Sequence, residues 1–224
     1  MFDFSSAENL TSMFDYCNSL TELKVPKKKT AKLKSVSRLF YGCSALESAD
    51  VSWLDTSGCD SFSYMFSYCS QLKTVDLSPL SFESAVNLNN MFSFCLKLES
   101  VDLSNKKAPL AEDFHEMFRR CKVLPTVNFT KFDAPSGVNF SSMFLECASL
   151  KELDMSSFKT TNATSMVQSA SCLKRSISAA LIPQRSHPWA VCSASARNSL
   201  MWILHILIHQ MSFPCTECSI NAGV

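Results

Sequence analysis

The stretch that decides the fold reads MFSYCSQLKTVDL at residues 65–77. Its opening phrase recurs as MFDYC at 13–17, LFYGC at 39–43, MFSFC at 91–95, MFRRC at 117–121 and MFLEC at 143–147. Each copy lies 26 residues after the previous one. A fixed period of this length is typical of proteins in which one small unit stacks on the next. Because stacked units present long surfaces, the period also favours binding over catalysis.

Residues 60–85 show two hydrophobic periods in succession. The apolar side chains from Phe62 to Leu72 are three or four residues apart, which predicts a short helix. Val75, Asp76 and Leu77 alternate as in a short strand, and Pro79 ends that strand because proline has no N–H to donate. The sequence therefore predicts an α/β repeat, a leucine-rich-repeat solenoid of about six 26-residue helix–strand units with an irregular C-terminal tail.

Two columns of the repeat are expected to form the core. We expect the rings of the first column to stack from unit to unit, and the thiols of the second to fill small spaces in the core. The ring column is Phe14, Phe40, Phe66, Phe92, Phe118 and Phe144, and the thiol column is Cys17, Cys43, Cys69, Cys95, Cys121 and Cys147. Cys59 lies off the period in a Ser-Gly loop, and we expect it to be an exposed thiol.

The strand of each unit carries one acidic or amide residue that should point away from the core. This column is Asp50, Asp76, Asp102, Asn128 and Asp154. With Lys73 and Lys151 beside it, the face formed by Asp50, Asp76, Asp102 and Asp154 is the ligand-facing surface that we predict from the sequence. A row of carboxylates could also hold a cation such as calcium, the alternative being a row of hydrated surface acids.

The repeat phrase resembles that of the BspA-like leucine-rich-repeat surface proteins, which have 26-residue repeats. The resemblance rests on the MFxxCxxL phrase, on VDLS at 75–78 and 101–104, and on LDTS at 54–57. It covers about residues 1–166. It implies a solenoid exposed at the cell surface or secreted, with adhesion or recognition of a protein or glycan ligand as its role. It implies no catalytic residues.

Residues 167–224 do not continue the repeat. The period places the next cysteine at position 173, where Leu173 stands, and the segment holds one of the chain's 17 phenylalanines. We therefore divide the chain into a solenoid at 1–166 and a non-repeat tail at 167–224. Our interpretation is that the tail is frameshifted or disordered. A divergent cap or a membrane-associated segment is the alternative.

The tail contains the sharpest metal-like pattern in the sequence. His205, His209, Cys215 and Cys218 are four soft ligands close together, which gives zinc as a weak alternative to a protein without a metal. The apolar run at 200–208 is too short for a membrane span, which needs about 20 residues.

Motifs for catalysis are missing from the sequence. Its four glycines do not cluster into a phosphate loop, and it has no G-x-S-x-G elbow. We predict a monomer that is not an enzyme and has no cofactor. The lysine run at 24–34 is expected to be a solvated loop rather than a nucleic-acid site, because the chain is nearly neutral.

Location and role stay open between alternatives. The first residues show no signal peptide, so a cytoplasmic protein is the alternative to a surface protein. The corresponding alternative functions are an intracellular leucine-rich-repeat scaffold and a non-functional fragment of a repeat gene.

Overall fold

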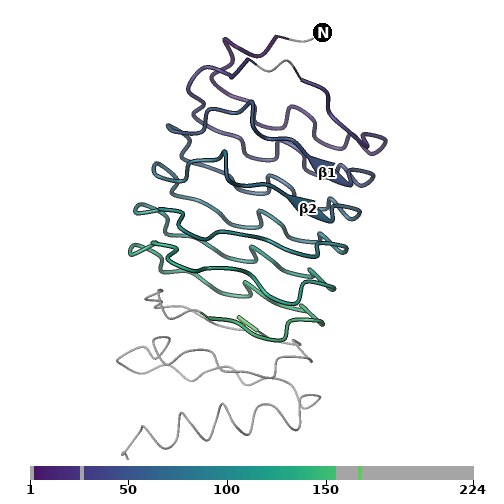
Figure 1. Ribbon diagram of the computed structural model, residues 1–224, viewed down its shortest axis with the longest axis vertical. Coiled ribbons are helices and arrows are strands. Elements are labelled where there is room, and N and C mark those ends of the chain that lie inside the picture. The colour runs from purple at the N-terminus through teal and green to yellow at the C-terminus, as the bar shows by residue number, and fades with distance from the viewer. Residues whose placement is uncertain (1–2, 26–27, 155–165, 168–224) are drawn as a thin grey trace, which may run out of the picture.

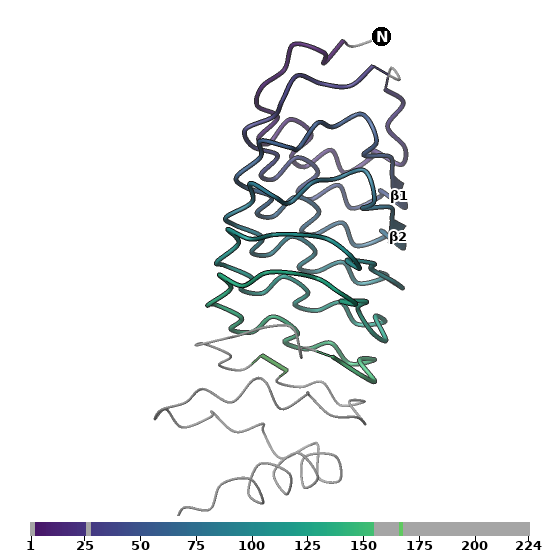
Figure 2. The same ribbon diagram turned by 60° about the vertical axis from the view of Figure 1, so that its left-hand side comes forward.

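The computed structural model describes residues 3–25, 28–154 and 166–167. In this part the chain winds through a single stack of rungs, one repeat to each rung, with the N-terminus at one end (Figure 1). Strands β1 (Ser48–Ala49) and β2 (Thr74–Val75) lie in neighbouring rungs and pair in parallel, Ser48 opposite Thr74. Figure 2 shows the same stack turned about its long axis. The stacked repeat predicted from the period is confirmed.

Isolated parallel bridges extend this pairing along the stack. One row joins residues that are 26 apart, namely Asn9, Ser35, Ser61, Asn87, Asp113 and Asn139. Further bridges join Asp102 with Asn128, Lys107 with Asp133, and Lys32 with Asp55. The register between rungs therefore equals the sequence period almost everywhere, so residues in equivalent positions lie next to each other as columns.

The helix predicted from Phe62 to Leu72 is wrong. The described residues contain no helix, and their strands are two residues long. Each rung instead makes two turns, each with one residue in the left-handed region at φ between 52° and 70°. The first column of such residues is Ser12, Arg38, Tyr64, Asn90, Glu116 and Ser142. The second is Tyr16, Gly42, Tyr68, Phe94, Arg120 and Glu146.

Hydrogen bonding between rungs explains why turns replace the helix. The N–H of Phe66 donates to the carbonyl of Met91 in the next rung at 2.9 Å, whereas the N–H of Met65 donates to Phe62 within its own rung at 3.2 Å. A right-handed helix would need every N–H for itself and cannot continue through a residue with positive φ. Two successive turns place apolar residues on one side at the same spacing as a helix does. The hydrophobic pattern therefore cannot distinguish a pair of turns from a short helix.

Short polar side chains turn the chain at corners of the rungs. Asn87, Asp76 and Asp55 each accept the backbone N–H of the residue two positions later, at 2.9, 2.8 and 3.1 Å. This local bond is the reason that Asn, Asp and Ser are favoured at tight turns. The sequence thus specifies each corner by one short polar side chain.

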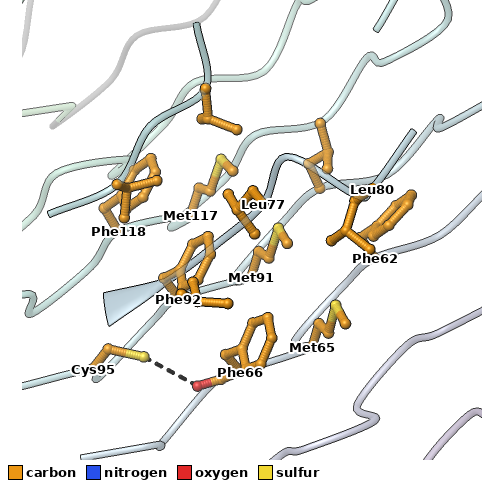
Figure 3. Close-up of a cluster of buried hydrophobic side chains, with 14 of the residues drawn as sticks. Phe62, Met65, Phe66, Leu77, Leu80, Met91, Phe92, Cys95, Met117 and Phe118 are labelled. Atoms are coloured by element: carbon orange, nitrogen blue, oxygen red, sulfur yellow. Dashed lines mark hydrogen bonds between the residues drawn. The ribbon is translucent and has the colours of Figure 1, made fainter. Parts of the chain in front are cut away.

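A ladder of phenylalanine rings runs through the core (Figure 3). Phe66 and Phe92 stack with their centroids 5.5 Å apart and their planes within 8°, and the ring column from Phe14 to Phe144 repeats this contact at 5.3–5.6 Å. Each such pair is worth about 0.5–1.5 kcal/mol beyond the area that it buries. Because every ring of the interior contacts two others, the ladder ties the rungs into one core.

The cysteines of the repeat do more than fill space. The Sγ of Cys95 donates to the carbonyl oxygen of Phe66 in the preceding rung at 3.1 Å, as Figure 3 shows. Cys43, Cys69, Cys121 and Cys147 make the same contact at 2.9–3.2 Å. Burial raises the pKa of the Cys43 thiol to about 12. These thiols are therefore neutral donors that join neighbouring rungs, while Cys17 in the first rung is exposed.

The expectation of an exposed Cys59 is wrong. Its side chain is buried, and its Sγ lies 3.3 Å from the carbonyl oxygen of Ser61. Burial raises the pKa of this thiol to about 11. The turn closed by the N–H of Cys59 and the carbonyl of Thr56, itself a buried residue, brings the thiol into the core.

Candidate functional site: an aromatic edge at the turns

The surface predicted from the sequence follows the strands. Asp50, Asp76, Asp102 and Asp154 are all exposed, as are Lys73 and Lys151. One oxygen of Asp76 accepts the N–H of Ser78, and Asp50 and Asp102 make the equivalent bond at 2.9 and 2.8 Å. Hydrogen bonds from the hydroxyl and N–H of Ser78 lower the pKa of Asp76.

These carboxylates therefore have a structural task of their own. Asn128 holds the same corner with its amide oxygen, which accepts the N–H of Thr130 at 3.0 Å. Because an uncharged side chain serves equally, the turn needs an acceptor and not a charge. Lys73 is held by Glu47 of the previous rung at 2.7 Å, so part of this face is already paired.

The described residues form neither a cluster of metal ligands nor a membrane-spanning helix. Within it, no three His, Cys, Asp or Glu side chains are grouped so as to hold a metal ion. The zinc alternative, His205, His209, Cys215 and Cys218, lies outside the described residues, as does the apolar run at 200–208. Among the residues that the structure describes, no helix has the length and hydropathy to cross a membrane.

A second surface lies where the two turns of each rung meet the solvent. It gathers all four tyrosines of the chain and all three arginines of the described part, together with Phe94. We call it the aromatic edge. It comprises Tyr16, Arg38, Tyr41, Tyr64, Tyr68, Phe94, Arg119 and Arg120. Tyr16 is 61% exposed and Tyr68 is 43% exposed.

The rings of the aromatic edge are in contact from rung to rung. Tyr41 meets Tyr16, Tyr68 and Tyr64 edge-on at 5.2, 5.5 and 6.1 Å between centroids. Tyr68 in turn stacks on Phe94 at 4.3 Å with planes within 10°. Burial, together with a hydrogen bond that the Tyr41 hydroxyl donates to Tyr16, raises the pKa of Tyr41 to about 12. The result is one continuous aromatic cluster across four rungs.

Each arginine of the edge lies on this cluster and is paired with an acid. Arg38 lies 4.0 Å above the Tyr41 ring and donates to Asp15 at 2.8 Å. Arg120 lies 5.0 Å from the Phe94 centroid and binds Glu146 with two bonds, at 2.7 and 3.1 Å. Their carboxylate partners raise the pKa of both guanidinium groups.

Arg119 completes the set of paired arginines. It lies 5.4 Å from the Phe94 centroid and donates to Glu116 at 2.8 Å. The edge thus holds three guanidinium groups and three carboxylates, and it is electrically balanced.

The one arrangement that looks catalytic is structural. His115 places Nδ1 2.8 Å from the hydroxyl of Ser141, and its Nε2 is 3.6 Å from Glu116. Nδ1 is also 3.0 Å from the carbonyl oxygen of Ser141, which can only accept, so Nδ1 carries the hydrogen. The Ser141 hydroxyl donates to Asn139 at 2.7 Å. The ring therefore cannot take a proton from this serine, which a nucleophile would require.

The sequence interpretation missed the aromatic edge for a definable reason. The repeat phrase was aligned on its invariant letters, and the edge occupies the variable ones. One turn position reads Tyr16, Gly42, Tyr68, Phe94, Arg120 and Glu146 down the rungs. The sequence did contain a signal for the edge, because all four tyrosines lie close to a repeat cysteine. Three of them are one or two residues before it, and Tyr64 is five residues before Cys69.

Two solved structures of leucine-rich proteins are similar to part of this chain. A leucine-rich cell-surface protein from Faecalibacterium prausnitzii A2-165 aligns with 69% of this chain and 38% of its own, at 18% identity and a TM-score of 0.47. A leucine-rich-repeat protein from Bacteroides ovatus aligns with 73% of this chain and 56% of its own, at 22% identity and a TM-score of 0.28. The chain thus spans well under half of the first protein and little more than half of the second.

No curated protein matches the chain. One family does, over two overlapping segments at residues 1–106 and 86–182, which together take in most of the 224 residues. The chain belongs to the DUF285 family, described as Mycoplasma proteins of unknown function.

Proposed function

We propose that this protein is a non-enzymatic recognition protein, exposed at a surface, that binds a protein or a glycan ligand. The observation that carries the proposal is the aromatic edge. Tyrosine and arginine dominate the energetics of binding surfaces because they combine large rigid area with hydrogen-bonding groups. Among the described residues, both types are concentrated on one side, and the other exposed residues are mainly Lys, Glu, Asp and Ser.

The strand face is the second candidate contact surface. Asp50, Asp76, Asp102 and Asp154 are exposed, as are Lys73 and Lys151 beside them. We place it second because its acids hold turns, and exposed ion pairs such as Lys73 with Glu47 contribute little energy.

The full chain, immobilised and presented to a panel of purified secreted proteins and to a glycan array, tests the function. We expect saturable binding to members of one class, with the heat-unfolded chain as control. Equal signals from folded and unfolded chain across both panels would refute recognition. Double variants on each face then separate the surfaces: Tyr16→Ala with Tyr68→Ala on the edge, and Lys73→Glu with Lys151→Glu on the strand face.

A further inference from the structure

We propose that the aromatic edge is a protein-docking surface whose partner presents an uncharged polypeptide patch. This inference rests on the proposed function and deepens it, because it selects one surface, one class of partner and one kind of interaction. The composition supports it first. Interface centres are enriched in Tyr, Phe and Arg, and the edge brings four tyrosines, three arginines and Phe94 together on one surface.

The charge of the edge indicates an uncharged complement. Each guanidinium group already binds a carboxylate of a neighbouring turn, Arg38 with Asp15, Arg119 with Glu116 and Arg120 with Glu146. A charged partner group would meet a carboxylate beside each guanidinium group, so the attraction of one is offset by the repulsion of the other. An uncharged patch can contact the rings and the guanidinium planes without breaking any pair.

The same pairs hold the edge ready for binding. Arg120 is fixed by two hydrogen bonds to Glu146 and by the ring of Phe94, and Tyr41 is fixed by three other tyrosines. Side chains that are already ordered lose little entropy when a partner arrives, which is a main cost of association. A tyrosine with only two rotatable bonds keeps that cost small.

The ring faces favour a polypeptide over a sugar. A sugar ring binds an aromatic side chain by lying on its face, and here Arg38 covers one face of Tyr41 while Tyr68 and Phe94 cover one face of each other. These contacts reduce the ring faces open to a sugar, whereas ring edges and phenol hydroxyls suit the mixed polar and apolar surface of a protein.

A set of buried polar atoms lies along the same edge. The structure gives five buried side-chain oxygen or nitrogen atoms no hydrogen-bond partner among the described residues. Four of them, Asp15 Oδ1, Ser67 Oγ, Ser93 Oγ and Arg119 Nε, belong to the column that contains Tyr41. Ser67 is 0% exposed and Ser93 is 1% exposed. Unsatisfied buried groups lower stability, and their concentration in this column indicates that the edge is shaped for something other than stability.

A random-peptide library displayed on phage, selected against the folded full chain, provides a defined polypeptide probe. We expect the enriched peptides to bind wild type and to lose at least about tenfold in affinity on the Tyr16→Ala, Tyr68→Ala double variant. Raising NaCl from about 0.15 M to about 1 M should change their affinity less than about threefold, because no net charge is screened.

Matched controls lie on other columns of the same rungs and their neighbours. Leu110→Ala with Val123→Ala removes two exposed apolar side chains elsewhere, and Lys73→Ala removes an ion pair with Glu47. Both should leave peptide affinity within about twofold of wild type. Circular dichroism and urea unfolding of each variant show that it is folded before its binding is measured.

The outcomes separate this inference from the proposed function. Failure to enrich peptides, equal peptide binding by the edge variant, or a steep loss with salt would overturn the docking surface. Binding of neutral glycans that the edge variant abolishes would assign the edge to a sugar and likewise overturn it. If the panels of secreted proteins and glycans show binding that only the strand-face variants reduce, recognition stands and the edge is not its site.

Discussion

The phenylalanine ladder and the aromatic edge are built on the same turns and have opposite characters. Inside, one column presents phenylalanine in all six rungs, stacked at 5.3–5.6 Å. Outside, two residues further along the chain, a column changes from Tyr16 to Gly42, Tyr68, Phe94, Arg120 and Glu146. Each inner ring must fit the rings above and below it in a closed core, whereas the outer side chains touch their neighbours at a surface that accepts residues of different size and charge. The outer column is therefore where a repeat of this kind can carry specificity.

The largest difference between inside and outside should appear in thiol reactivity. Peptide-resolved alkylation at about pH 8 should label Cys17, which is exposed, at least about a hundredfold faster than Cys95, which reacts only when the rungs open. Burial raises the pKa of Cys95 and leaves its reactive thiolate scarce. Similar labelling rates for the two thiols would show that the interior is not closed as described.

A core ring should matter more for stability than a ring of the aromatic edge. Phe92→Ala removes stacking with both Phe66 and Phe118 and leaves a cavity, so the free energy of unfolding should fall by about 3–5 kcal/mol. Tyr68→Ala should cost no more than about 1.5 kcal/mol, because its stacking partner Phe94 lies at the surface. Urea unfolding measures both, and a larger cost for Tyr68→Ala would reverse the distinction.

The Gly42→Ala variant tests the left-handed turn that positions both the phenylalanine ladder and the aromatic edge. Its φ is 70°, and an added Cβ would lie 2.8 Å from the ring of Tyr16, so Gly42→Ala should destabilise the fold by about 1 kcal/mol or more. Gly58→Ala is the control. It has no left-handed φ, and its Cβ would meet only the flexible side chain of Lys32, so its cost should stay within about 0.5 kcal/mol. Equal costs would remove the argument for a left-handed turn at Gly42.

The strand face should contribute the smallest effect, seen only in acid. Hydrogen bonds from Ser52, Ser78 and Ser104 lower the pKa of Asp50, Asp76 and Asp102. Their contribution to stability is thus present above the ordinary carboxyl pKa, near pH 4, and is lost as the pH falls below it.

Asparagine keeps this corner without a charge, as Asn128 shows. Changing the three aspartates to Asn should therefore leave the thermal midpoint near neutral pH almost unchanged and flatten its decline in acid. A large loss of stability at neutral pH would mean that the charges themselves hold the corners.

The period made the stack and its inner columns predictable, because packing between rungs repeats at every turn of the chain. That two turns replace the expected helix was not predictable. Phe62, Met65, Phe66 and Cys69 have helical spacing, but alternate N–H groups are drawn to the next rung, and this competition does not show in one repeat. The burial of Cys59 was not predictable for a similar reason. A Ser-Gly loop is typical of the surface, but here its turn brings the thiol into the core.

The aromatic edge depends on contacts that no single repeat contains. Tyr41 and Tyr64 lie at different positions of the repeat and meet only because neighbouring rungs are in register. The column from Asp50 to Asp154 was easier to find in the sequence, because it repeats regularly. Its regular repetition, however, reflects the corner that the chain turns at this position of the rungs. Positions that vary between rungs, examined together along the stack, were the better guide to a binding surface.

The hydrogen bonds under the aromatic edge give the stack a direction. At these turns the N–H groups of Val36, Arg38, Phe40 and Gly42 all donate to the following rung, and the same positions of later rungs do likewise. The N–H groups of Lys34, Asp60 and Val86 at a neighbouring corner donate instead to the preceding rung, so the opposed rows leave the stack without the large dipole of a helix. Within the edge itself, however, every such bond points the same way along the stack. A partner lying along the edge therefore meets a surface with a direction, and its two possible orientations are unequal in energy.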